Sequence, residues 1–195
     1  MIYWIAYVLV SLLSKICFSF RIRGLGHIPP RGSFILASNH ISNLDPFVIG
    51  LAFHRRISYL AKDSLFKNEV LAFFLYHVGA FPIKRDSSDI KALKEILKRL
   101  KFGCPVVIFP EGTRIPMKKV REVLPGIGFV AVKSGVPVIP VFIEGTDNVL
   151  APGARGFRYG PIQLSFGKAL TFSKGDSYPE IARGIMQSIQ DLAFM

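Results

Sequence analysis

The residues best suited to chemistry lie within residues 39–45, which have the sequence NHISNLD. His40 is a candidate general base, because histidine has the side chain whose ordinary pKa lies closest to neutral pH. A base needs a partner that orients it, and Asp45 is the only carboxylate before Asp63. Residues five positions apart do not face each other on one regular helix, so a loop must bring this pair together. The alternative is that His40 is a turn residue and Asp45 only a helix cap.

A second segment with chemical potential is residues 79–86, with the sequence GAFPIKRD. An apolar stretch ends here in two cations, Lys84 and Arg85. An arginine side chain can bind a phosphate group through two parallel hydrogen bonds. Arg85 is therefore a candidate phosphate ligand, and the alternative is ordinary charge at the end of a strand.

The third segment is residues 109–114, with the sequence FPEGTR. It follows another apolar stretch, and its glycine predicts a tight turn that presents charged side chains to one space. Glu111 is a candidate to orient Arg114 or a hydroxyl group of a substrate. The alternative is a surface turn with a local ion pair, which the distinctive six-residue string makes less attractive.

Strand and helix patterns alternate along the chain and predict an α/β fold with a mainly parallel sheet flanked by helices. The candidate segments follow predicted strands, where such folds bind their ligands. Proline at position 140, inside a predicted strand, indicates an edge strand or a bulge. We expect strands at 34–38, 57–61, 79–83, 105–109, 138–143 and 162–166, and helices at 46–53, 65–77, 87–101, 128–134 and 178–194.

Residues 1–20 are apolar at all but four positions, and those four fall on one side of a helix. We expect a hydrophobic, membrane-associating helix here, followed by an α/β domain at residues 21–195. A helix of this length also comes near the thickness of a bilayer core, so both a spanning and an interfacial position stay open. The alternative is a buried N-terminal helix.

Composition supports a membrane surface as the partner of this protein. Apolar residues make up 50% of the 195 positions, and 25 Lys and Arg against 13 Asp and Glu give a net charge of +12. Such a basic chain prefers anionic partners, and its high hydrophobicity favours anionic lipid over nucleic acid. No recognised nucleic-acid-binding motif accompanies the charge, so we expect no nucleic-acid partner.

Taken in order, these segments closely resemble the glycerolipid acyltransferase family, and within it the 1-acyl-sn-glycerol-3-phosphate acyltransferases. NHISNLD resembles the H-x4-D block of the family, GAFPIKR its second block, FPEGTR its third and VPVIPV its fourth. The resemblance covers about residues 24–145. One departure is the pair Ile115 and Pro116, which stands where members often have a small polar residue.

The resemblance implies transfer of a fatty acyl group from an acyl thioester to the free hydroxyl of 1-acyl-sn-glycerol-3-phosphate (lysophosphatidic acid), which forms phosphatidic acid in phospholipid biosynthesis. The thioester is that of acyl-carrier protein or coenzyme A, and no metal or other cofactor is implied. His40 would remove the hydroxyl proton and Asp45 would hold the imidazole. Backbone N–H groups near Gly112 are candidates to stabilise the oxyanion. The implied acceptor-binding residues are Arg85, Glu111, Gly112, Thr113 and Arg114.

The family resemblance and the charge together imply an enzyme at the cytoplasmic face of the cell membrane, in contact with anionic lipids. No G-x-S-x-G motif is present, which favours direct transfer without an acyl-enzyme. Three alternatives stay open: an acyltransferase for another lysophospholipid or glycerol-3-phosphate, an esterase using Ser38 or Ser42, and a non-catalytic basic lipid-binding protein.

Overall fold

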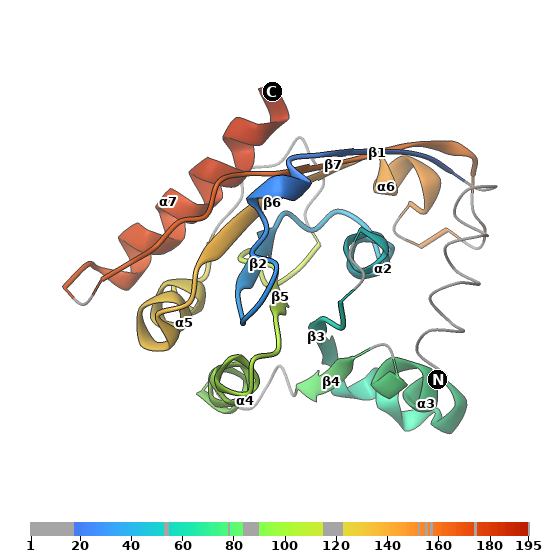
Figure 1. The fold of residues 1–195 in the computed structure, drawn as a ribbon. Helices are drawn as coiled ribbons and strands as arrows, with labels where there is room; N and C mark the ends of the chain where they lie inside the picture. Colours follow the sequence, from blue (N-terminus) through green and yellow to red (C-terminus); the bar gives the residue numbers. More distant parts are fainter. Residues whose placement is uncertain are drawn as a thin grey trace.

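The computed structural model describes residues 18–52, 55–77, 79–83, 90–114, 123–151, 153–154, 156, 158–173 and 175–194. In this part of the chain one sheet holds seven strands, in the order β1-β7-β6-β2-β5-β3-β4 (Figure 1). The strands are β1 (Phe18–Arg23), β2 (Ile35–Ser38), β3 (Ser58–Lys62), β4 (Ala80–Ile83), β5 (Val106–Ile108), β6 (Val138–Glu144) and β7 (Gly160–Phe166).

Helices connect most of the strands. The α-helices are α2 (Asp45–Leu51), α3 (Glu69–His77), α4 (Ile90–Lys101), α5 (Gly126–Ser134), α6 (Thr146–Val149) and α7 (Tyr178–Asp191). Three short 3-10 helices are η1 (Leu25–His27), η2 (Asp63–Lys67) and η3 (Leu192–Phe194). The described helices are all too short or too polar to cross a bilayer, and α7, the longest of them, has 14 residues.

Strand direction decides where the site is built. β2 pairs in parallel with β5 and β6, and β3 pairs in parallel with β4 and β5. β7 then runs antiparallel to β6, and β1 pairs in parallel with β7. The predicted mainly parallel sheet is therefore confirmed, with two reversed strands on one side. The carboxyl ends of β2 through β6 all meet at one edge, which we call the carboxyl edge.

Each face of the sheet carries its own apolar core, because side chains alternate along every strand. Within β6, Val138 and Phe142 belong to the first core, whereas Ile139 and Ile143 belong to the second core. Helices α4, α5 and α7 cover the first face, and α2 and α6 lie against the second (Figure 1). The sheet between these helices is the rigid layer that positions the loops at the carboxyl edge.

Pro140 lies inside β6, which is an interior strand of this sheet. Of the two predicted explanations, an edge strand or a bulge, the bulge applies, and it lies in the facing segment. Val141 pairs with Phe166, while Val138 pairs with Leu170, so the facing chain holds one extra residue. The missing N–H of proline falls at this irregularity, and the Pro140 carbonyl accepts a hydrogen bond from the Gly167 N–H at 2.9 Å.

The prediction of a helix over residues 1–20 is wrong for its last three residues, because residues 18–20 begin strand β1. Phe18 and Phe20 pack on the second core, while Ser19 and Arg21 are exposed, which is the two-residue alternation of a strand. The whole of β1 pairs with β7. Residues 1–17 lie outside the described residues, so the membrane-associating helix stays a prediction for that segment.

Two helical glycines test how closely α5 and α7 pack. A Cβ on Gly128 of α5 would lie 2.2 Å from the Tyr178 carbonyl oxygen, whereas a Cβ on Gly184 of α7 would meet nothing within 4 Å. We expect Gly128→Ala to lower the free energy of unfolding by about 1–3 kcal/mol through overpacking. Gly184→Ala, the matched control, should raise it by about 0.5–1 kcal/mol through helix propensity. Urea unfolding measures both, and equal effects would contradict the close packing.

Candidate active site

The candidate residues converge at the carboxyl edge. His40 follows β2, and Glu111 to Arg114 follow β5, the strand beside β2. Asp45 is the first residue of α2, with Leu44 at the N-cap position and Pro46 in the first turn, so Asp45 is not the helix cap that the alternative interpretation expected. Arg85 lies outside the described residues, although β4, the strand before it, stands two places from β5 in the same sheet.

The structure brings His40 and Asp45 together across a loop. The Nδ1 atom of His40 lies 2.8 Å from Oδ2 of Asp45. The His40 side chain is 16% exposed and that of Asp45 is 0% exposed. A carboxylate only accepts hydrogen bonds, so the neutral imidazole that makes this bond carries its proton on Nδ1 and keeps its lone pair on Nε2. This is the geometry of a general base held by a buried acid.

Asp45 accepts hydrogen bonds from four donors. Besides His40, the backbone N–H groups of Ile41 and Ser42 donate to Oδ2 at 2.7 and 2.8 Å. The Thr146 hydroxyl donates to Oδ1 at 2.6 Å. A buried carboxylate is tolerated only when donors replace its lost hydration, and these four do so.

His40 is also fixed from its other sides. Its ring stacks on that of Phe109, with centroids 4.1 Å apart and planes inclined by 20°. Its backbone N–H donates to Oε2 of Glu111 at 2.9 Å, and Glu111 is 5% exposed. Glu111 therefore supports the loop that carries His40. Our expectation that it also binds the acceptor stays a prediction.

The turn after β5 is shaped by Gly112. Its φ of +66° is a backbone conformation that favours glycine, and a Cβ there would lie 2.5 Å from Cδ1 of Leu124. The Gly112 N–H donates to the Phe109 carbonyl at 3.0 Å. That N–H closes the turn, which argues against our candidate oxyanion donor at Gly112 itself.

Arg114 and Thr113 stand exposed beyond this turn. Nη1 of Arg114 donates to the Asn43 side-chain oxygen at 2.9 Å, which joins the FPEGTR turn to the loop between His40 and Asp45. An exposed guanidinium beside the loop that carries His40 can bind an anionic group. Among the described residues, no group of three or more His, Cys, Asp and Glu is placed to hold a metal ion.

Ser38 and Ser42, the candidate esterase nucleophiles, are both fully buried. The Ser38 hydroxyl donates to the Asn39 carbonyl at 3.1 Å, and the Ser42 hydroxyl donates to the Leu150 carbonyl at 2.8 Å. A nucleophile must face both its base and the substrate. These contacts give the two serines structural roles and weigh against an esterase.

Sequence reasoning missed two supports of the site. The Asn39 amide pairs with both backbone groups of Ile143, which extends the contact between β2 and β6. Thr146 lies 101 residues from Asp45 along the chain. Asn39 is adjacent to His40 and could have been suspected, but no local pattern marks Thr146.

Comparison with known proteins identifies the family. The sequence model of the family described as Acyltransferase matches residues 19–144. The chain belongs to this acyltransferase family. The matched range contains His40, Asp45 and the FPEGTR turn, together with strands β2 to β6.

Individual relatives are named after one activity. The chain is 30% identical to the chloroplastic 1-acyl-sn-glycerol-3-phosphate acyltransferase BAT2 of Brassica napus, a match covering 83% of this chain and 48% of that protein. It is also 30% identical to the 1-acyl-sn-glycerol-3-phosphate acyltransferase of Bacillus subtilis, over 74% of this chain and 70% of that protein. The chain thus spans about half the length of the first of these relatives.

A solved structure has the same fold as this chain. The 1-acyl-sn-glycerophosphate acyltransferase PlsC from Thermotoga maritima superimposes with a TM-score of 0.78 at 25% identity. The alignment covers 99% of this chain and 82% of that one. The α/β architecture is therefore that of a known acyltransferase.

Proposed function

We propose that this acyltransferase moves a fatty acyl group from an acyl thioester to the free hydroxyl of 1-acyl-sn-glycerol-3-phosphate, which forms phosphatidic acid. The observation that carries this proposal is the bond from Nδ1 of His40 to the buried Asp45, which leaves Nε2 as a base. Similarity to enzymes named for this reaction supports the choice of acceptor. The donor is the thioester of acyl-carrier protein or of coenzyme A.

The reaction needs one proton acceptor and one attacking oxygen. Nε2 of His40 takes the proton of the acceptor hydroxyl as its oxygen attacks the thioester carbonyl. The tetrahedral intermediate collapses, the C–S bond breaks, and the thiolate leaves with the proton from the imidazolium. The products are the new ester and a free thiol, and Asp45 stabilises the transient imidazolium throughout. No covalent enzyme intermediate is required.

The acceptor headgroup would lie against the exposed turn after β5. Arg114 offers a planar pair of donors to the phosphate, with Thr113 and the Gly112 backbone beside it. Arg85 is the second arginine among the proposed acceptor-binding residues. Another lysophospholipid or glycerol-3-phosphate fits the same chemistry. A non-catalytic lipid-binding protein would give no reason for the His40–Asp45 bond.

The direct test is a lipid-product assay with purified protein. Acyl-carrier-protein and coenzyme A thioesters are crossed with lysophosphatidate, glycerol-3-phosphate and an uncharged monoacylglycerol as acceptors. Phosphatidate as the main product supports the proposal. Release of free fatty acid without ester formation would show hydrolysis in place of transfer.

We expect His40→Ala to lower the turnover by about 10²–10⁴-fold, the usual contribution of a general base. Asp45→Asn should also be severe, because the amide no longer offers His40 a charged acceptor. Circular dichroism and thermal melting check that both variants are folded. Near-normal turnover in a folded His40→Ala protein would remove the proposed mechanism.

Arg114→Ala should lower kcat/KM for lysophosphatidate by about 10–150-fold, the loss expected for a charged hydrogen bond. The loss should be much smaller with a monoacylglycerol, which has no phosphate. Arg114→Lys should recover only part of the activity, because it lacks the planar pair of donors. Arg85→Ala is measured in parallel. Equal losses for both acceptors would assign the arginine to the fold or to the donor.

The lipid substrate must reach His40 from a membrane, and we propose that η2 and α3 contact that membrane. Both follow β3, so they begin at the carboxyl edge. Between Glu69 and His77, α3 has no charged residue, and much of its apolar surface is exposed. Exposed large apolar side chains of the two helices are those of Leu65, Val70, Leu71, Phe73 and Tyr76. Anionic lipids and the cytoplasmic face of the cell membrane suit the charge of +12 and the thioester donors.

The double variant Val70→Asp and Phe73→Asp should lower binding to phosphatidylglycerol vesicles at least tenfold, since each buried apolar side chain contributes about 1.5–3 kcal/mol. Phe102→Asp is the matched control, because Phe102 is 73% exposed but precedes β5 at the opposite edge. Binding is measured by sedimentation with vesicles at high salt, which screens most of the electrostatic attraction between the protein and the lipid. A deletion of residues 2–17 tests the expected N-terminal anchor in the same assay. Unchanged binding of the double variant would exclude α3 as a membrane contact.

A further inference from the structure

Side-chain hydrogen bonds join residues 39–45 to residues 143–150. Asn39 pairs with the N–H and carbonyl of Ile143 at 2.7 and 2.8 Å, and the Ser42 hydroxyl donates to the Leu150 carbonyl at 2.8 Å. Thr146 donates to Asp45 at 2.6 Å. Most of the second segment lies beyond the family match, which ends at residue 144.

Within this set of contacts, Thr146 alone reaches the carboxylate of Asp45 from the second segment. Oδ2 already accepts from the His40 ring and from the backbone of Ile41 and Ser42. The donor to Oδ1 is the Thr146 hydroxyl, and both Thr146 and Asp45 are 0% exposed. Because water does not reach this carboxylate, a lost donor is not replaced from bulk solvent.

We propose that Thr146 is a positioning residue for the His40–Asp45 pair. The terminal torsion of an aspartate has a broad energy well, so donors on one oxygen leave the carboxylate plane free to turn. The Thr146 hydroxyl holds the other oxygen and keeps Oδ2 directed at Nδ1 of His40. This role rests on the proposed function only in that His40 is the base.

The experiment compares Thr146→Val, which keeps the shape but removes the donor, with Thr146→Ser, which keeps the donor. Ser58→Ala is the control, because it removes a buried hydroxyl at the amino end of β3, which is the end away from the carboxyl edge. We expect Thr146→Val to lower kcat about tenfold or more with little change in KM, the effect of one hydrogen bond to a charged group. Thr146→Ser should recover most of kcat, and Ser58→Ala should match the wild type.

A second measurement does not depend on turnover. The NMR signal of the proton between Nδ1 of His40 and Asp45, assigned by its absence in His40→Ala, reports on that hydrogen bond. Thr146→Val should change the chemical shift of this signal, and Thr146→Ser and Ser58→Ala should leave it in place. If the signal changes as expected but neither the wild type nor any variant transfers acyl groups, the Thr146 contact stands and the proposed function fails.

Two results would overturn the proposal. The first is a Thr146→Val protein with wild-type kcat and an unchanged His40 signal, which would give Thr146 a packing role only. The second is an equal change in Thr146→Val and Thr146→Ser. It would assign the effect to altered packing, because Val keeps the methyl group and loses the hydroxyl, whereas Ser does the reverse. If Thr146→Val does not fold, Thr146→Ser with the wild-type signal and kcat supports the hydroxyl role, and a changed signal in it overturns that role.

Discussion

The buried carboxylate of Asp45 is the constraint on which the site depends. An ionised group without water is stable in a protein only when donors surround it, and losing one partner of such a group typically costs several kcal/mol. Its donors come from the loop after β2 and from α6, which follows β6. The pair of His40 and Asp45 therefore exists only where β2 and β6 are neighbours, as the sheet order provides.

The division between a buried acid and a partly exposed base suits proton transfer. Asp45 is sealed, so its charge acts on His40 at low dielectric, while His40 keeps enough exposure for Nε2 to meet a substrate. Phe109 supports the imidazole ring from one side, and Glu111 holds the backbone below it. The turn that carries FPEGTR contacts the loop of this base through Glu111 and Arg114, and its residues 112–114 are exposed.

Much of this arrangement could be predicted from the sequence because its causes are local. The predicted strand at 34–38 corresponds to β2, and the predicted helix at 46–53 corresponds to α2. An apolar strand followed closely by Asp45 and Pro46 is sufficient to predict that His40 and Asp45 lie at the end of a strand. β1 was missed because Phe18 and Phe20 continue an apolar run, and only pairing with β7 makes them a strand. Thr146 was missed for a related reason. A single hydroxyl has no periodic pattern, and its partner is 101 residues away.

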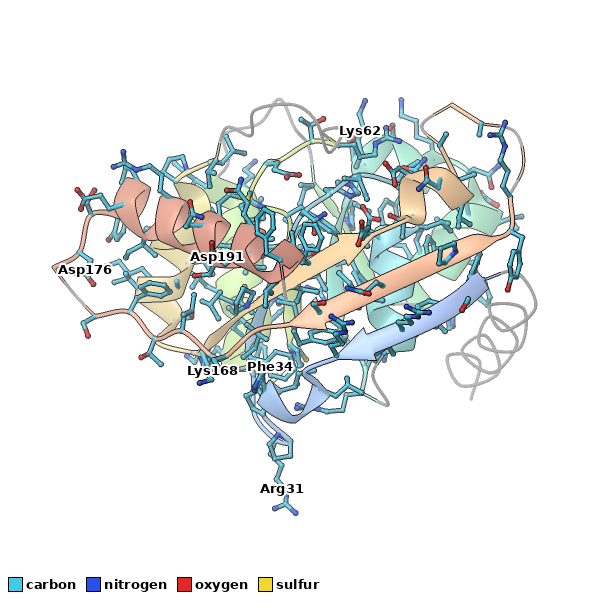
Figure 2. The ribbon with its side chains drawn as sticks, turned by 90° about the horizontal axis from the view of Figure 1, so that it is seen from above. Arg31, Phe34, Lys62, Lys168, Asp176 and Asp191 are labelled. Carbon is cyan, nitrogen blue, oxygen red and sulfur yellow. The ribbon has the colours of Figure 1, made fainter. Side chains whose placement is uncertain are left out.

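The two reversed strands explain how a four-residue helix can hold the Asp45 carboxylate in place. α6 is too short to be stable by itself, since isolated helices need about 12–15 residues to form. Its position is set by β6, whose last four residues pair with β7, beside which β1 lies (Figure 2). The last of these pairs is Glu144 with Gln163, and only Gly145 separates Glu144 from Thr146. If the sheet ended at β6, this end would be an edge with unpaired backbone groups and a loosely held helix. β7 and β1 therefore support the candidate site, although none of its candidate residues lies on either strand.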